Sequence, residues 1–258
     1  MKRWAWLESP ALLLALIALW WVATHGQWVS RVFVPTPEAT WESLAQGLGL
    51  VPGGGDGAGA LVDFSAATTG RMLAGWLLAS ALGVALGALI GASETARAWL
   101  QPSLEFIRPL PASAVMPLAI SIFGLSGGMV LAVVAFGAMW PVLLATVHGL
   151  ASVHPRLREV AQALQLSRGE IVWKIGLPNA LPDILAGMRL SMTVSLIVSV
   201  VGEMIASQPG LGQAILLAAR AFRASELFAG IALLGMIGFV SNAALAALER
   251  RLLRWQRP

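Results

Sequence analysis

The segment over residues 159–182 is a charged interruption, bounded by prolines, in an otherwise largely apolar chain. Its sequence, EVAQALQLSRGEIVWKIGLPNALP, places acidic, basic and proline residues between two long apolar runs. The chain has no Cys, which excludes disulfides, thiolate metal sites and thiol nucleophiles. It also lacks a HExxH motif, a Gly-x-Ser-x-Gly elbow and a phosphate-binding loop. We therefore expect no catalytic site, cofactor or metal, and we expect residues 159–182 to form a water-exposed surface for a partner.

A second set of polar residues recurs every fourth position after this segment: Ser191, Ser195, Ser199 and Glu203. On a helix this spacing makes a slowly turning polar ridge roughly 18 Å long. One interpretation is that the ridge lines a substrate path, because intramembrane acids usually face a bundle interior or water. The other is that the serines pack helices together while Glu203 pairs with Arg71 or Arg220. The sequence favours packing for the serines and leaves Glu203 open.

The composition is that of a helical membrane protein. The chain has 258 residues, of which 57% are hydrophobic and 12% charged, with a mean hydropathy of +0.77. These values exclude a soluble domain and a disordered chain and favour a polytopic helical bundle. The pI of 10.9 could indicate nucleic-acid binding. Because Lys and Arg flank the apolar runs, they are better explained as topology signals, and we expect no nucleic-acid partner.

The apolar runs predict six membrane-spanning helices. They are residues 9–24, 72–93, two spans within 109–155 separated at 124–128, 184–205 and 227–248. A cleaved signal peptide is an alternative for the first run, but no small-x-small site follows it. Residues 38–46 are expected to form a short amphipathic helix within a polar connector over residues 31–70. Within the second span, Gly75, Ala79, Gly83, Gly87 and Gly91 form a stripe of small residues that predicts close packing against another helix.

The distribution of basic residues orients these spans. Six spans place both termini on one side, and 13 of the 17 Lys and Arg then fall on that side. The other four are Arg31, Arg71, Arg220 and Arg223. Because cytoplasmic loops carry an excess of Lys and Arg, the sequence predicts cytoplasmic termini and a cytoplasmic segment 159–182.

Segment 159–182 is predicted to fold as helix, turn and helix. The first helix covers residues 158–166. Ser167 and Glu170 have the spacing of a capping box, and Leu166 and Ile171 that of a hydrophobic staple. The second helix is expected to end at Leu177–Pro178, with Pro178 and Pro182 redirecting the chain into the membrane.

Through this segment the chain resembles a known family, the inner-membrane permease subunits of binding-protein-dependent ABC importers. Their cytoplasmic signature is Glu-Ala-Ala, three residues, Gly, nine residues, Ile, one residue and Leu-Pro, and every interval matches from Glu159 to Pro178. Two positions depart: Val160 replaces Ala and Gln165 replaces Gly. The resemblance covers about residues 64–248 and is strongest to the nitrate, sulfonate and taurine branch, on residues 34–37, 102–117, 202–205 and 210–212. It implies that the ATPase-coupling residues are Glu159, Val160, Ala161, Gln165, Ser167, Gly169, Ile175, Leu177 and Pro178.

The resemblance also implies the molecular context. The fold would be the all-α transmembrane domain of a type I ABC importer, with residues 1–63 as an N-terminal helix and periplasmic connector, 64–248 as the permease core and 249–258 as a basic cytoplasmic tail. The chain would form a homodimeric path in the bacterial inner membrane, with two ATPase subunits and a periplasmic binding protein that Glu203 could touch. It would not itself hydrolyse ATP. The alternative is an ion-coupled secondary transporter, which needs paired ionisable residues at mid-membrane, and only Arg189 and Glu203 approach that arrangement.

Overall fold

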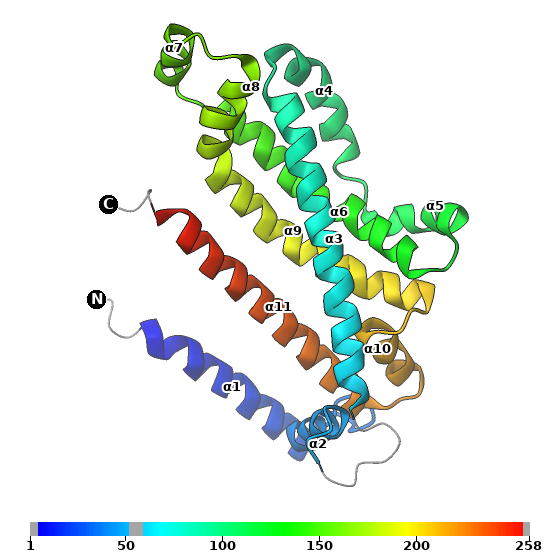
Figure 1. Ribbon diagram of the computed structural model, residues 1–258. Helices are drawn as coiled ribbons and strands as arrows, with labels where there is room; N and C mark the ends of the chain where they lie inside the picture. Colours follow the sequence, from blue (N-terminus) through cyan, green and yellow to red (C-terminus); the bar gives the residue numbers. More distant parts are fainter. Residues whose placement is uncertain (1–4, 52–58, 255–258) are drawn as a thin grey trace. The chain divides into compact units, whose positions relative to one another are not determined.

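The computed structural model describes residues 5–51 and 59–254, and every regular element in those residues is helical (Figure 1). The described chain forms two compact units. The first contains residues up to Ala67 together with Pro209–Met236, and the second contains Thr68–Gln208 and the residues from Ile237 onward. The predicted all-α fold is confirmed.

The first unit contains two complete helices near the N-terminus, α1 (Ala5–His25) and α2 (Pro37–Gly47). The start of α3 (Ala60–Gly91), α10 (Leu211–Arg220) and the start of α11 (Ala224–Leu252) complete it. Helix α2 confirms the short helix predicted for residues 38–46. The connector predicted over residues 31–70 was too long, because α3 begins inside it at Ala60, and α10 adds a short helix between the fifth and sixth predicted spans.

A hydrogen bond joins α1 to α2 within this unit. The indole Nε1 of Trp21 donates to Glu38 Oε1 at 2.8 Å. Thr36 caps α2, since its hydroxyl accepts from the Ala39 amide at 3.2 Å. Backbone N–H donation at the start of α2, and then the bond from Trp21, hold the pKa of Glu38 below its usual range. The carboxylate is therefore ionised at neutral pH and remains an acceptor for the indole.

The second unit carries the remaining elements. They are α4 (Glu94–Ile107), α5 (Ala112–Phe123), α6 (Gly127–Ala151), α7 (Pro155–Ala163), α8 (Arg168–Ile171), the π-helix η1 (Val172–Gly176) and α9 (Leu177–Ala206), with parts of α3 and α11. The segment between Glu94 and Arg108 is charged and yet mostly helical. Ser93 caps α4 by accepting from the Ala96 amide at 3.2 Å, which explains why a charged segment still forms a helix.

Within residues 5–51 and 59–254, four helices are long and apolar enough to cross a membrane: Ala60–Gly91, Gly127–Ala151, Gly169–Ala206 and Ala224–Leu252. A fifth crossing arises in the described residues if α4 and α5, which meet at 90°, count as one bent span. The first predicted span corresponds to α1. The apolar part of α1 that the structure describes, Ala11–His25, is shorter than the four helices above. The third predicted span is only the 12-residue α5, which at 1.5 Å per residue is about 18 Å long and too short to cross alone.

Prolines and glycines set the limits of α5. Pro111 precedes the first residue of α5 and has an extended conformation. The ring of Pro111 fixes φ, and its nitrogen carries no hydrogen to donate. At the other end Gly124 adopts a φ of +66°, which only Gly adopts without a steric penalty. Ser126 then starts α6 by accepting from the Met129 amide at 3.1 Å. The predicted break at residues 124–128 is confirmed.

The stripe of small residues on α3 packs against α6, as predicted. A Cβ added to Gly83 would lie 2.9 Å from the Val142 Cβ, and one added to Gly87 would lie 2.6 Å from the Thr146 Cβ. Non-bonded atoms essentially never approach a Cβ atom so closely. The glycines therefore allow the two helix backbones to come together, which is the usual role of small residues between membrane helices.

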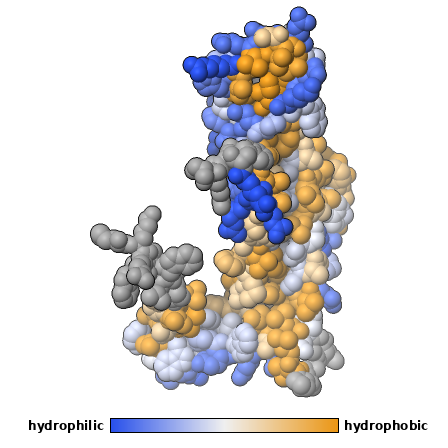
Figure 2. All heavy atoms as spheres, turned by 60° about the vertical axis from the view of Figure 1, so that its left-hand side comes forward, coloured by the Kyte–Doolittle hydropathy of each residue, from blue (hydrophilic) through white to orange (hydrophobic). Residues whose placement is uncertain are grey.

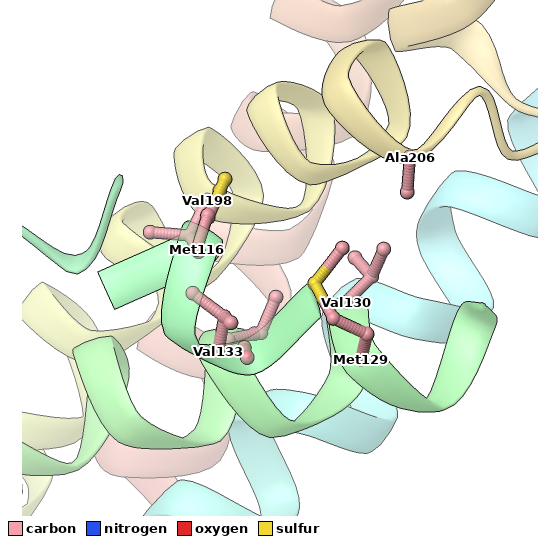
Figure 3. Packing of buried hydrophobic residues seen from close by; sticks show 8 residues of the cluster. Met116, Met129, Val130, Val133, Val198 and Ala206 are labelled. Atoms are coloured by element: carbon pink, nitrogen blue, oxygen red, sulfur yellow. The ribbon is translucent and has the colours of Figure 1, made fainter. Parts of the chain in front are cut away.

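The core of the second unit joins α5, α6 and α9 (Figure 3). Its labelled members are Met116 from α5, Met129, Val130 and Val133 from α6, and Val198 and Ala206 from α9. Small residues also separate α6 from α9, since a Cβ on Gly187 would lie 2.7 Å from that of Ala145. These contacts fix α9 along α6, so both ends of α9 have defined surroundings.

Candidate coupling surface and polar cluster

Helix α7 presents an apolar stripe to water. His154 caps the helix, because its Nδ1 accepts from the Arg156 amide at 3.2 Å. Leu157, Val160 and Leu164 follow at helical spacing, and their exposed fractions are 42%, 51% and 66%. Figure 2 shows hydrophobic surface surrounded by hydrophilic side chains at the end of the molecule that contains α7. An apolar patch with a polar rim is typical of a protein–protein contact.

The turn after α7 is a Schellman motif in the described backbone. The Leu166 amide donates to the Ala161 carbonyl at 3.0 Å, and the Gln165 amide donates to the Gln162 carbonyl at 3.0 Å. Gln165 has a φ of +52°, the left-handed conformation that such a motif requires and usually gives to Gly. The family signature has Gly at this position, and the structure keeps the turn with Gln in its place.

The predicted capping box is confirmed. The Ser167 amide donates to Glu170 Oε2 at 2.9 Å, and the Glu170 amide donates back to the Ser167 hydroxyl at 3.3 Å. Lys174 Nζ reaches the other carboxylate oxygen of Glu170 at 2.8 Å. These bonds begin α8 shortly after the turn at Gln165. The turn and the capping box together fix the direction in which the chain leaves α7.

The helix that begins at this box continues into the membrane, which corrects the prediction that Leu177–Pro178 ends it. Helix α8, η1 and α9 follow one another without a break. The amide of Leu177 donates to the Val172 carbonyl, which is the wider π-type spacing. Pro178 follows directly in α9, and the wider π-type turn before it accommodates the missing N–H of the proline within the continuous helix. Asn179 ties this turn to α6 by donating to the Gly149 carbonyl at 3.1 Å.

The predicted coupling residues divide by exposure. Glu159, Val160, Gln165, Ser167, Gly169 and Pro178 are exposed, while Ile175 and Leu177 are half-buried. Ala161 is fully buried, with an exposed fraction of 0%. A side chain without exposed surface does not reach a partner, so Ala161 stabilises the loop from within. This difference depends on how α7 packs against the rest of the unit, which the spacing of residues along the chain does not predict.

The polar ridge on α9 is buried. Glu203, with an exposed fraction of 0%, forms an ion pair with Arg71 and accepts from the Thr68 hydroxyl at 2.9 Å. Arg71 and Arg220 were the two partners expected for Glu203, and the structure shows the ion pair with Arg71. The Ser191 hydroxyl donates to the Ala138 carbonyl of α6 at 2.6 Å, and Ser195 donates to its own helix at the Met192 carbonyl, 2.8 Å away.

These bonds place the serines between packed helices. Ser199 is also fully buried, and its hydroxyl oxygen has no hydrogen-bond partner in the described part of the chain. The favoured interpretation of the serines as packing residues fits this geometry, and their role as path-lining residues does not. Among the described residues, no group of three or more His, Cys, Asp or Glu could hold a metal ion.

The neighbouring face of α9 lines a cavity of about 530 Å³ between α5, α6 and α9. Its walls include Leu190, Val194 and Ile197, which alternate with the buried serines along the helix. Its polar members are Arg108, Ser113 and Trp140. None of these three was among the site residues predicted from the sequence. The charge of Arg108 next to Pro109 was a visible signal, whereas nothing in the sequence distinguishes Trp140 from the chain's other tryptophans.

Two bacterial proteins are similar to the chain over nearly its whole length. One is a Bacillus subtilis protein whose name, SsuC, assigns it to aliphatic sulfonates transport as a permease protein; it is 33% identical over 99% of this chain and 90% of its own length. The other is the taurine transport system permease protein TauC of Escherichia coli, 33% identical over 98% of this chain and 93% of its own length.

A solved structure and a family model complete the comparison. A chain of the MetNI methionine ABC transporter, in an inward-facing conformation, has the same fold with a TM-score of 0.66 and 17% identity, covering 75% of this chain and 96% of that one. The model of the binding-protein-dependent transport system inner membrane component family matches residues 79–254, which contain the capping box, the ridge and the cavity. The chain therefore belongs to this family, the inner-membrane permease subunits of binding-protein-dependent ABC importers.

Proposed function

We propose that this permease imports a small organic anion of the sulfonate class, taurine included, which a periplasmic binding protein delivers. The names of the two relatives support this substrate class. A second copy of the chain completes the path, and two copies of a separate ATPase subunit drive it. Residues 64–248 form the permease core, residues 1–63 precede it, and the basic tail over 249–258 lies with the N-terminus in the cytoplasm.

The observation that supports this mechanism is an exposed apolar stripe on α7, which a short turn at Gln165 joins to α8, η1 and α9, three elements that follow one another without a break. Leu157, Val160 and Leu164 are exposed on the side of the membrane that the basic residues assign to the cytoplasm. Lipid does not cover them there, so a protein partner has to. The ATPase subunit is the partner that these importers require, and we place its contact on this stripe.

The route from the contact to the path is a helix. When ATP binding brings the two ATPase subunits together, a displaced α7 moves α8 through the short turn at Gln165. Helix α8 continues through η1 into α9, one wall of the 530 Å³ cavity. Rigid helical elements transmit displacement over such distances. Residues exposed on α7 therefore contact the partner, and Ala161 keeps the loop's shape.

Reconstitution in liposomes tests this proposal. The chain, its ATPase subunit and the binding protein are assembled, and ATP-dependent uptake of radiolabelled taurine is measured. Val160→Asp places a charge in the stripe and is expected to reduce both uptake and the ATPase activity of the assembly about tenfold or more, as for a residue central to an interface. Gln162→Asp is the matched control, because it adds the same charge to α7 outside the stripe and is expected to retain uptake.

Two outcomes would contradict the proposal. Unchanged uptake in Val160→Asp would remove α7 as the coupling surface. Taurine accumulation by the chain alone, driven by a proton or sodium gradient without ATP, would show secondary transport instead. Membrane insertion of each variant is checked by its yield in detergent, so that a folding defect is not read as lost coupling.

A further inference from the structure

The polar side chains of α4 form a single stripe along the helix. At about 100° per residue, five of them fall within an arc of about 80°: Glu94, Arg97, Gln101, Glu105 and Arg108, the residue that ends the helix. We call these five residues the α4 stripe. Trp99 and Phe106 lie on the opposite side of the helix, with exposed fractions of 79% and 84%. Helix α4 therefore has a charged face and an apolar face, and both reach the surface of the chain.

The length of α5 sets the depth of the α4 stripe in the membrane. Helix α4 follows α3 on the side that the basic residues assign to the cytoplasm, and α5 ends next to the start of α6 on the other side. The 12 residues of α5 extend about 18 Å, whereas the hydrocarbon layer is about 30 Å thick. Helices α4 and α5 pass as a membrane span only together, as one bent pair.

The turn between the two helices adds little to this length. It is folded, because the Leu110 amide donates to the Ile107 carbonyl at 3.0 Å. The distance that α5 leaves uncrossed, about 12 Å from the lengths above, therefore falls to α4. The end of α4 has to enter the hydrocarbon layer, and it takes Glu105 and Arg108 with it.

At this depth the charged residues of the stripe need water or a partner. Glu105 and Arg108 are exposed, and α4 has no buried residue, so the interior of this chain does not enclose them. Gln101 donates to Glu105 at 2.9 Å, while no carboxylate in the described part of the chain forms an ion pair with Arg108. Lipid does not suit these groups, because charges inside a membrane face a bundle interior or a water-filled cavity.

A second copy of the chain in dry contact with the stripe is the other candidate neighbour. The twofold axis that relates two copies in one membrane runs along the membrane normal, so equivalent residues lie at the same depth. Contact at this axis would bring each Arg108 towards its own equivalent, and like charges repel strongly where no water separates them. Water between the copies removes the conflict.

We propose that the α4 stripe lines the water-filled cytoplasmic half of the transport path. This inference rests on the proposed function and adds to it the surface along which the substrate leaves. The stripe carries two acids and two arginines, so its formal charge is balanced. A wall of this kind keeps the path hydrated, and it neither repels an anion nor retains it, as release requires. The face with Trp99 and Phe106 lies against lipid.

Two neighbouring positions at nearly the same depth test this assignment. Glu105→Cys places a thiol on the stripe, and Phe106→Cys places one on the apolar face; the wild-type chain has no Cys and gives the background. Each variant is treated with a membrane-impermeant maleimide in inverted vesicles, where the cytoplasmic side faces the reagent. Glu105→Cys is expected to react about tenfold faster or more, because the thiolate is the reactive form and apolar surroundings raise the pKa of a thiol.

Gln101→Cys repeats the test without removing a charge. It lies one turn closer to the cytoplasm on the same stripe and is expected to react as fast as Glu105→Cys. In the reconstituted assembly, the attached maleimide group is expected to cause loss of ATP-dependent taurine uptake, because it occupies the path. The same treatment of Phe106→Cys is expected to leave taurine uptake unchanged.

Three outcomes overturn the inference. Slow reaction of both Glu105→Cys and Gln101→Cys, with a disulfide between copies on oxidation, would show a dry contact between two chains; slow reaction without that disulfide would show another cover. Equally fast reaction of Glu105→Cys and Phe106→Cys would place all of α4 in the cytoplasm, outside the bilayer. Full taurine uptake by labelled Gln101→Cys would show that the stripe lies in water but outside the path.

The labelling needs no transport, so the two proposals fail separately. If the stripe reacts as expected while the wild-type assembly imports no taurine, the water-lined surface stands and the assigned substrate class is wrong. If the wild-type assembly imports taurine while the stripe does not react, the function stands and the inference about α4 is overturned.

Discussion

At the scale of single residues, the Arg71–Glu203 ion pair places a charged group inside the packed helices. Glu203 has no exposed surface, and a buried charge is tolerated only when a partner and hydrogen bonds compensate it. The Arg71 guanidinium and the Thr68 hydroxyl provide both. Because Arg71 and Thr68 lie on α3 and Glu203 lies near the end of α9, the pair holds two membrane helices together.

Removal of one partner should therefore cost more than removal of both. Arg71→Ala leaves Glu203 buried without its counter-charge, and we expect the free energy of unfolding to fall by about 3–5 kcal/mol. The double variant Arg71→Leu with Glu203→Leu should lose much less, because apolar residues of similar volume replace a buried pair well. Thermal denaturation in detergent compares the stability of the wild-type chain, Arg71→Ala and the double variant.

The exposed Arg223–Glu226 pair, 3.1 Å apart, is the control for this comparison. Arg223→Ala should cost about 1 kcal/mol or less, since both groups remain in water. If Arg71→Ala were as mild as Arg223→Ala, Glu203 would not depend on its partner. A double variant as unstable as Arg71→Ala would show that the missing contacts, and not the unpaired charge, cause the loss.

At the scale of elements, the turn between α7 and α8 stores a small strain. Gln165 occupies a left-handed conformation, which costs an ordinary L-residue roughly 1–2 kcal/mol. Gln27, Ser207 and Phe222 have the same sign of φ and also follow helix ends. At Gln165 the capping box on Ser167 and Glu170 offsets the strain by fixing the next helix.

Gln165→Gly should accordingly stabilise the turn by about 1 kcal/mol, because Gly adopts positive φ without the clash. The expected result is slower hydrogen exchange of the Leu166 amide, which bonds to Ala161 across the turn, with taurine uptake retained. Gln162→Gly is the matched control: it lies inside α7 and should destabilise the helix by about 1 kcal/mol. Faster exchange in Gln165→Gly would mean that Gln165 makes a contact worth more than the strain.

The sequence could predict local features of these elements and not the tertiary ones. The capping box and the Gly124 break depend on residues within one or two turns, so spacing alone identified both. The continuation of α8 through Pro178 could not be predicted, since η1 and the bond from Asn179 to α6 accommodate the proline. The short α5 and the cavity beside it depend on a 90° bend and on the packing of three helices. The hydrophobic periodicity of the sequence predicts neither the bend nor this packing.

At the scale of the whole molecule, apolar side chains cover long surfaces on several helices. Exposed examples are Leu12 and Leu16 on α1 and Phe239 and Val240 on α11. In water such faces would aggregate, whereas lipid or a second copy covers them in a membrane. The bilayer thus completes the fold, and the asymmetry of the charged residues decides which ends face the cytoplasm.

The uneven distribution of Lys and Arg predicts which residues face the cytoplasm. The absence of Cys makes this orientation simple to test by cysteine labelling. Thirteen of the 17 Lys and Arg lie on the side assigned to the cytoplasm, so Gln165 should face the cytoplasm and Ala221 the periplasm. Both residues are exposed. In Gln165→Cys, a membrane-impermeant maleimide should react only in inverted vesicles, and in Ala221→Cys it should react in spheroplasts. The wild-type chain, which has no Cys, controls for background. Labelling of Gln165→Cys in spheroplasts would reverse the orientation, and the stripe on α7 would then face away from every ATPase in the cell.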